Sequence, residues 1–203
     1  MTNTLHRNDL PANVSFGKAV AIDTETLGLN PHRDRLCLVQ LSAGNGDAHL
    51  VQIDRGQTAA PRLQALLADP HVLKIFHFAR FDMAVLSHRL GVMPAPIFCT
   101  KIASKLTRTF TDRHGLKDLC KDMLNIELSK QQQSSDWAAG SLTPEQLAYA
   151  ASDVLYLHKL KDGLAAMLAR EERTGLAEAA FQFLPTRARL DLGGFAADDI
   201  FAH

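Results

Sequence analysis

The feature that most constrains the fold is an apolar run that ends in two acidic residues. In residues 19–30, AVAIDTETLGLN, four apolar residues lead directly into Asp23 and Glu25, and a turn is expected at Gly28. Residues two apart in a strand point to the same face, so both carboxylates aim at one point. Burying one unpaired carboxylate is costly, and burying two side by side costs more. The fold must therefore expose this strand end or place something positive between the two acids.

Short apolar runs and helical patterns follow one another along the chain. Strands are predicted over residues 18–23, 35–44, 48–54, 72–78 and 95–100, and helices over 60–69, 79–91, 101–108, 115–124 and 144–173. The first three strands have short connections, which favours an antiparallel meander. The last helix has a clear start, because Thr143, Pro144 and Gln146 form a capping-box pattern. These elements predict an α/β fold, a mixed sheet flanked by helices with a helical C-terminal half.

Length and composition predict one ordinary globular domain. The chain has 203 residues, which suits a single domain over 1–203, with residues 176–203 as a tail packed on the domain or on a neighbouring subunit. No apolar run approaches the ~20 residues of a membrane span, and no signal peptide is visible. Three dispersed cysteines are typical of reduced thiols in a cytoplasmic protein. Acidic and basic residues number 22 each, which argues against a strongly basic surface for long nucleic acids.

Two further acids lie in apolar surroundings. Asp82 is in HFARFD, and Asp153 is in YAASD, with Tyr149 one helical turn before it on the same face. Four converging carboxylates are tolerable only if protons or cations neutralise them. Oxygen ligands without histidine or cysteine favour Mg²⁺ or Mn²⁺, and the matching chemistry is phosphodiester hydrolysis with two metal ions.

The motifs IDTET, HFARFD and YAASD, with QQSSDW ahead of the third, resemble the DEDDy branch of the DEDD 3′→5′ exonucleases, the ribonuclease D group. The resemblance implies a ribonuclease H-like fold, with two Mg²⁺ or Mn²⁺ ions held by Asp23, Glu25, Asp82 and Asp153. It makes Tyr149 the residue that orients or helps to deprotonate the attacking water. One position departs from the family pattern, since Phe78 stands where many relatives have Asn.

Ribonuclease D carries additional helical domains for which this chain has no room, and the whole sequence is most similar to compact bacterial members of the group that degrade very short RNA. This resemblance implies cleavage of dinucleotides to mononucleotides and a ring-shaped homo-octamer. Leu29 is similar to the apolar wedge between bases in such enzymes, although a loop leucine covering the core is an equal alternative. The other substrate-binding candidates are Thr26, His77, Gln133, Ser134 and Trp137. His77 has a structural role as its alternative, and Trp137 has anchoring of its loop in the core.

Two other functions remain open from the sequence. A broader exonuclease would use the same chemistry to trim longer RNA or single-stranded DNA. A silent nucleic-acid-binding module is disfavoured, because all four acids and the tyrosine are present.

Overall fold

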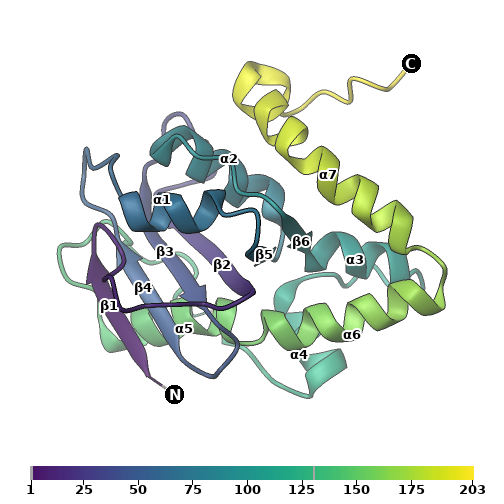
Figure 1. Cartoon of the computed structure of the whole chain (residues 1–203), viewed down its shortest axis with the longest axis horizontal. Helices are drawn as coiled ribbons and strands as arrows, with labels where there is room; N and C mark the ends of the chain where they lie inside the picture. Colours follow the sequence, from purple (N-terminus) through teal and green to yellow (C-terminus); the bar gives the residue numbers. More distant parts are fainter. Residues whose placement is uncertain (1, 130) are drawn as a thin grey trace.

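The protein is built on a mixed sheet of six strands in the order β1-β4-β3-β2-β5-β6 (Figure 1). The computed structural model describes residues 2–129 and 131–203. The strands are β1 Asn3–Arg7, β2 Ala19–Thr26, β3 Leu36–Ser42, β4 Ala48–Gln52, β5 Leu73–Phe76 and β6 Ile97–Cys99. Strands β2, β3 and β4 pair antiparallel, while β5 is parallel to β2 and β6 is parallel to β5. The predicted meander with added parallel strands is therefore confirmed.

Strand β1 was not predicted. It pairs in parallel with β4 at the edge of the sheet, from Asn3 opposite Ala48 to Arg7 opposite Gln52. Its side chains are exposed apart from the half-buried His6, so the segment lacks the alternation of apolar and polar residues that identifies a strand. Backbone hydrogen bonds to β4 hold it, and the side-chain pattern does not encode them.

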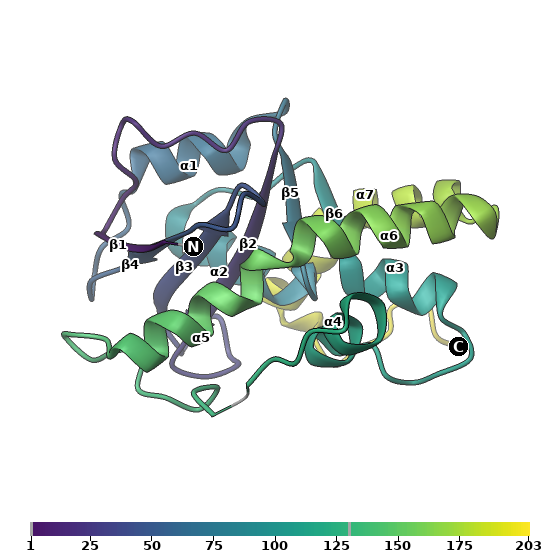
Figure 2. The same cartoon turned by 90° about the horizontal axis from the view of Figure 1, so that it is seen from below.

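Helices cover both faces of the sheet (Figures 1 and 2). Helix α1, Pro61–Ala68, and helix α2, Ala79–Leu90, bury apolar residues in one main core with β2 and β3. Helix α5, Pro144–Leu155, contacts β2, β3 and β4 and closes a smaller core on the other face. The predicted capping box at its start is confirmed by hydrogen bonds in both directions between Thr143 and Gln146.

The second half of the chain is helical, as predicted, but the long helix over 144–173 is not continuous. Helix α5 ends at Leu155 and helix α6, Leu157–Arg170, begins after Tyr156, whose ψ of −6° interrupts the regular geometry. Helix α5 lies on the sheet, whereas α6 packs on α3, Thr100–Thr107, and α4, Leu116–Leu124. One straight helix cannot follow both surfaces, so the predicted single helix is wrong at this point (Figure 2).

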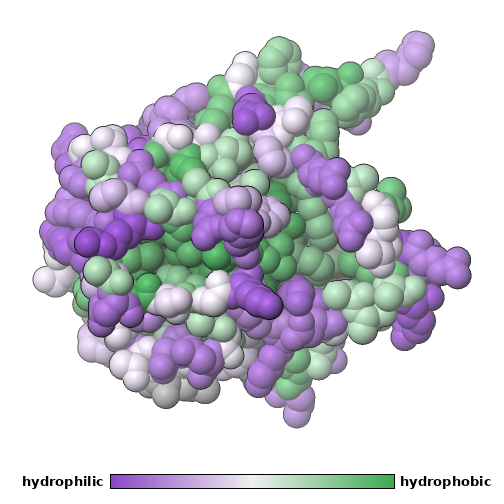
Figure 3. All heavy atoms as spheres, in the orientation of Figure 1, coloured by the Kyte–Doolittle hydropathy of each residue, from purple (hydrophilic) through white to green (hydrophobic). Residues whose placement is uncertain are grey.

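The C-terminal segment is mostly a helix. Helix α7, Thr174–Leu190, buries Phe181 and Leu184 in the main core and continues into a π-helical turn, Asp191–Phe195. Exposed apolar side chains follow at its end, including Phe195 and Phe201, and hydrophobic atoms gather there in Figure 3. Packing of these exposed residues on a neighbouring subunit stays a prediction. Within the described residues, no helix is long and apolar enough to cross a membrane.

Candidate active site

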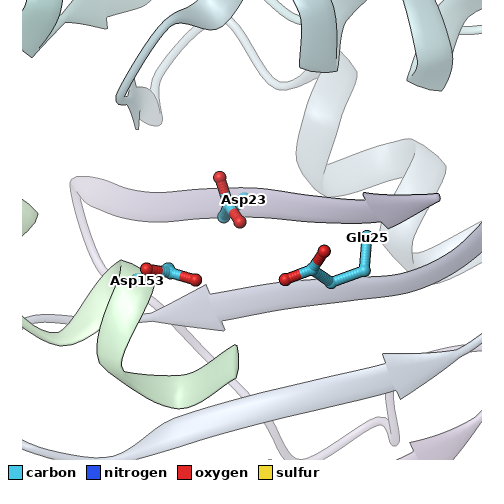
Figure 4. A group of neighbouring side chains, drawn as sticks. All are labelled: Asp23, Glu25 and Asp153. Carbon is cyan, nitrogen blue, oxygen red and sulfur yellow. The ribbon is translucent and has the colours of Figure 1, made fainter. Parts of the chain in front are cut away.

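Three carboxylates meet where β2 ends beside α5. Asp23 and Glu25 project from β2, and Asp153 reaches them from α5 (Figure 4). One carboxylate oxygen of each lies within 4.8 Å of the others. Hard oxygen atoms at this spacing suit Mg²⁺ or Mn²⁺, which prefer carboxylate ligands. The two-residue period of the strand thus brings Asp23 and Glu25 to one face, as the sequence predicts.

The fourth predicted acid stands apart from this trio. Asp82 is buried on α2, and its Oδ1 accepts a hydrogen bond of 2.6 Å from Thr24 Oγ1. Thr24 alternates with Asp23 and Glu25 along β2, so its hydroxyl reaches the helix on the other side of the strand. Asp82 is still near enough for the Asp23 charge to raise its pKa, after burial, which is the larger cause.

Burial and mutual repulsion dominate the electrostatics of the cluster. Burial raises the pKa of Asp23 to about 7. Burial and the charges of Asp23, Asp153 and Asp82 raise the pKa of Glu25 to about 10. The pKa of Asp153 also rises, first from burial and then from Asp23. Since each acid resists losing its proton beside the others, a cation is the group that allows all of them to ionise together.

The carboxylates of Asp23, Glu25 and Asp153 line a cavity of 330 Å³. Tyr149, one helical turn before Asp153, lines it as well. Burial, followed by the charges of Asp153, Glu25 and Asp23, raises the pKa of its phenol above the ordinary value. In the metal-free site Tyr149 therefore keeps its proton at neutral pH and can donate a hydrogen bond. Its ring lies 6.0 Å from that of Trp137, which supports it from the side.

His77 and two lysines line the same cavity. The Nδ1 of His77 is 2.9 Å from Thr100 Oγ1, and burial, followed by the positive charge of Lys101, lowers the pKa of His77 to about 3. The imidazole is therefore neutral. Lys101 and Lys117 supply positive charge in the same cavity as the carboxylates, which suits a phosphate-bearing ligand.

Phe78, the departure from the family pattern, has a φ of 73° at the start of α2. This left-handed conformation is unfavourable for a bulky residue and easier for Asn. Its ring is exposed, and Lys101 Nζ lies 4.3 Å from the ring centroid. The side chain therefore offers a cation–π contact instead of a polar amide.

Most other substrate-binding candidates line a neighbouring cavity of 500 Å³. This cavity brings together Glu25, Thr26, Leu29, Gln133, Ser134 and Trp137. Leu29 is 84% exposed, so it does not cover the core. Trp137 is 2% exposed and packs with Cys37 and Leu38 in the smaller core, as its structural alternative predicts, while also forming part of the cavity wall.

The predicted turn at Gly28 needs a glycine for space and not for a left-handed backbone. Gly28 has no positive φ; instead, a Cβ at this position would lie 2.2 Å from Asp34 Oδ2. Asp34 Oδ2 also accepts a hydrogen bond from Asn30 N at 3.0 Å. The glycine is needed for space, because the loop that presents Leu29 folds tightly around the Asp34 carboxylate.

Lys101 and Gln40 were not among the site residues predicted from the sequence. Lys101 gives no signal, because lysine on a helix is ordinary. Gln40 does give one, since it is a fully buried polar residue in the otherwise mostly apolar strand β3, LCLVQLS. Its amide nitrogen lies 3.4 Å from Asp23 Oδ2 and 3.5 Å from Glu25 Oε1.

A model of the 3′-5′ exonuclease family matches residues 6–169. The chain belongs to this family. The exonuclease is 37% identical over 154 residues to the ribonuclease D of Acidiphilium cryptum, a match that covers 76% of this chain and 39% of the relative. The chain thus spans about two-fifths of the length of that ribonuclease D.

Solved structures agree with this assignment. The exonuclease superposes on Brucella melitensis NrnC with bound Mg²⁺ with a TM-score of 0.96 and 62% identity, covering 100% of both chains. For Brucella melitensis NrnC bound to pGG, the TM-score is 0.97 and the identity 63%, over 100% of this chain and 99% of that one. Escherichia coli RNase D matches with a TM-score of 0.73 and 28% identity, over 84% of this chain and 45% of that one. The predicted ribonuclease H-like exonuclease fold is confirmed.

Proposed function

We propose that this exonuclease degrades very short RNA, dinucleotides above all, to mononucleotides by hydrolysis that depends on two Mg²⁺ or Mn²⁺ ions. The observation that carries the proposal is the meeting of Asp23, Glu25 and Asp153 within 4.8 Å, in a cavity that Tyr149 also lines. The oxygen-only donor set fits these ions. When bound, such ions lower the pKa of a water nucleophile and stabilise the leaving oxygen.

The residues of the chain then have distinct tasks. Asp23, Glu25, Asp82 and Asp153 would hold the metal ions, with Thr24 fixing the orientation of Asp82 through its 2.6 Å hydrogen bond. Tyr149 would orient the attacking water as a hydrogen-bond donor, because its raised pKa keeps the phenol protonated.

The preference for short RNA is supported by the scale of the site. The two adjoining cavities measure 330 and 500 Å³, and Glu25 and Gln133 line both. Leu29 would separate two bases, and Thr26, Gln133 and Ser134 line the same cavity as this leucine. Brucella melitensis NrnC, similar over its whole length, has been solved bound to pGG.

A length comparison tests the proposal. Initial rates are measured on 5′-phosphorylated RNA of two and ten residues, in Mg²⁺ and in EDTA, with Asp23→Ala as the inactive control. We expect rapid release of mononucleotides from the dinucleotide, slow attack on the longer RNA and no turnover in EDTA. Full activity in EDTA would exclude metal-dependent hydrolysis, and equal rates on both lengths would remove the preference for dinucleotides.

The second candidate is a broader exonuclease that trims longer RNA or single-stranded DNA. The similarity to ribonuclease D favours it, including the E. coli enzyme, described as an exoribonuclease involved in structured RNA processing. Equal rates on the two lengths, or activity on single-stranded DNA, would select this function.

The resemblance also predicts a ring-shaped homo-octamer, and the exposed apolar residues at the end of the chain would suit a subunit interface. Sedimentation velocity would test this, with an octamer expected and a monomer contradicting the prediction. The three cysteines are all buried and unpaired, which supports the proposed cytoplasmic location.

A further inference from the structure

Gln40 lies in the middle of β3, directly across from Asp23 in the antiparallel pairing with β2. Cross-strand partners point to the same face, so the amide faces the carboxylates. The side chain is 0% exposed, among the apolar neighbours Val39 and Leu41. A glutamine so deeply buried needs partners for its amide, because burying an unpaired amide is costly.

The partners of the amide are the acids of the site. The Nε2 group is 3.4 Å from Asp23 Oδ2 and 3.5 Å from Glu25 Oε1, so its two hydrogens are divided between two carboxylates. The Oε1 atom has no hydrogen-bond partner among the described residues. When both acids are ionised, as metal binding requires, the reverse orientation would turn this oxygen toward two acceptors, so the observed orientation is the one that suits the metal-bound state.

A neutral donor is the group that this position requires. A lysine or arginine would neutralise the carboxylates and compete with a metal ion for them, and an apolar residue would leave them without a donor. When a cation allows both acids to ionise, the amide can donate to both of them without adding a charge of its own. We propose that Gln40 is a positioning residue that holds the Asp23 and Glu25 carboxylates in the orientation that binds the metal ion. This inference rests on the proposed metal-dependent function.

The buried oxygen gives the inference a distinctive consequence. An unsatisfied buried acceptor destabilises the fold, and an apolar residue of similar shape removes it. Gln40→Met removes this orphaned acceptor together with two long donor contacts, so it should change the stability of the metal-free protein little. The same change should weaken Mg²⁺ binding by about 10- to 100-fold, as is typical when a group that orients metal ligands is removed.

The control is Gln52→Met. Gln52 is also a buried glutamine, 5% exposed, on the neighbouring strand β4. Its amide contacts Arg7 and the carbonyl of Ala139 instead of the acids. Replacing it should lower stability and leave Mg²⁺ affinity unchanged.

Mg²⁺ titrations of the full-length wild type, Gln40→Met and Gln52→Met, followed by calorimetry and by melting temperature, test the inference. Turnover of Gln40→Met should recover at saturating Mg²⁺, since the ligands themselves remain. Equal Mg²⁺ affinity in Gln40→Met and wild type would overturn the role of Gln40 while leaving the proposed function intact. A wild type that binds no Mg²⁺ would instead remove the proposed function. If neither Gln40→Met nor Gln40→Leu folds, the amide serves the fold and the inference fails.

Discussion

Asp153→Asn should make the metal-free protein more stable and at the same time prevent it from working. Asp153 lies within 4.8 Å of Asp23 and Glu25. Two unit charges at that distance repel by about 3.5 kcal/mol at an effective dielectric of about 20. At pH 8 Glu25, with its pKa near 10, keeps its proton, so the repulsion that remains is that with Asp23. Asp153 also resists ionisation, so the wild type carries only part of this repulsion. We therefore expect the free energy of unfolding of Asp153→Asn in EDTA to exceed that of the wild type by about 1–3 kcal/mol.

Mg²⁺ should reverse the order of stability. A metal ion at 100 times its dissociation constant stabilises the wild type by about 2.7 kcal/mol, and a variant that has lost a ligand gains much less. Urea unfolding at pH 8, in EDTA and in Mg²⁺, measures both quantities on the two proteins. Dinucleotide hydrolysis by Asp153→Asn should be undetectable under both conditions.

The pH dependence of the wild type in EDTA has a determined sign. The folded chain holds protons on Glu25 from the ordinary pKa of 4.5 up to about 10, whereas the unfolded chain has released them. The contribution of Glu25 to the free energy of unfolding is therefore fully present below pH 4.5, and it is lost as the pH rises toward about 10. Mg²⁺ affinity should rise over the same interval, since the ion displaces these protons.

The matched control is Asp162→Asn, the same chemical change at an exposed acid on α6 that pairs with Lys161. It should leave stability and Mg²⁺ response unchanged. The reasoning is refuted if Asp153→Asn lowers stability in EDTA, or if Mg²⁺ stabilises it as strongly as it stabilises the wild type.

Three further substitutions test the site. Tyr149→Phe should lower kcat by about 10²-fold or more and leave KM for the dinucleotide nearly unchanged, because only the hydroxyl that orients water is lost. Steady-state kinetics measure both constants, and a selective rise in KM would contradict this role. Leu29→Ala should raise KM without changing the melting temperature, since the side chain is 84% exposed; an unchanged KM would show that Leu29 separates no bases. Gly28→Ala should lower the free energy of unfolding by about 1–3 kcal/mol and raise KM, because the Cβ of the alanine would displace the Asp34 carboxylate. Urea unfolding measures the first effect, and a variant as stable as the wild type would contradict the close approach of Asp34 to this turn.

Some elements of the fold were readable locally, because their own residues encode them. The apolar run of β2, the capping box at Thr143 and the left-handed Gly91 that ends α2 each depend on a few neighbouring residues. Strand β1 and the break at Tyr156 were not readable in this way. The first is held by backbone bonds to a strand more than 40 residues away, and the second follows from the two surfaces on which α5 and α6 pack.

The same division applies to the site. The sequence by itself predicted which residues carry the chemistry, because four acids and a tyrosine in apolar surroundings have few other uses. Only the tertiary structure decided that Asp82 stands apart on Thr24, that Gln40 faces two carboxylates and that Lys101 enters the cavity. These relations join segments distant in sequence, and the distances and burial that set their strength exist only when the sheet and helices have packed.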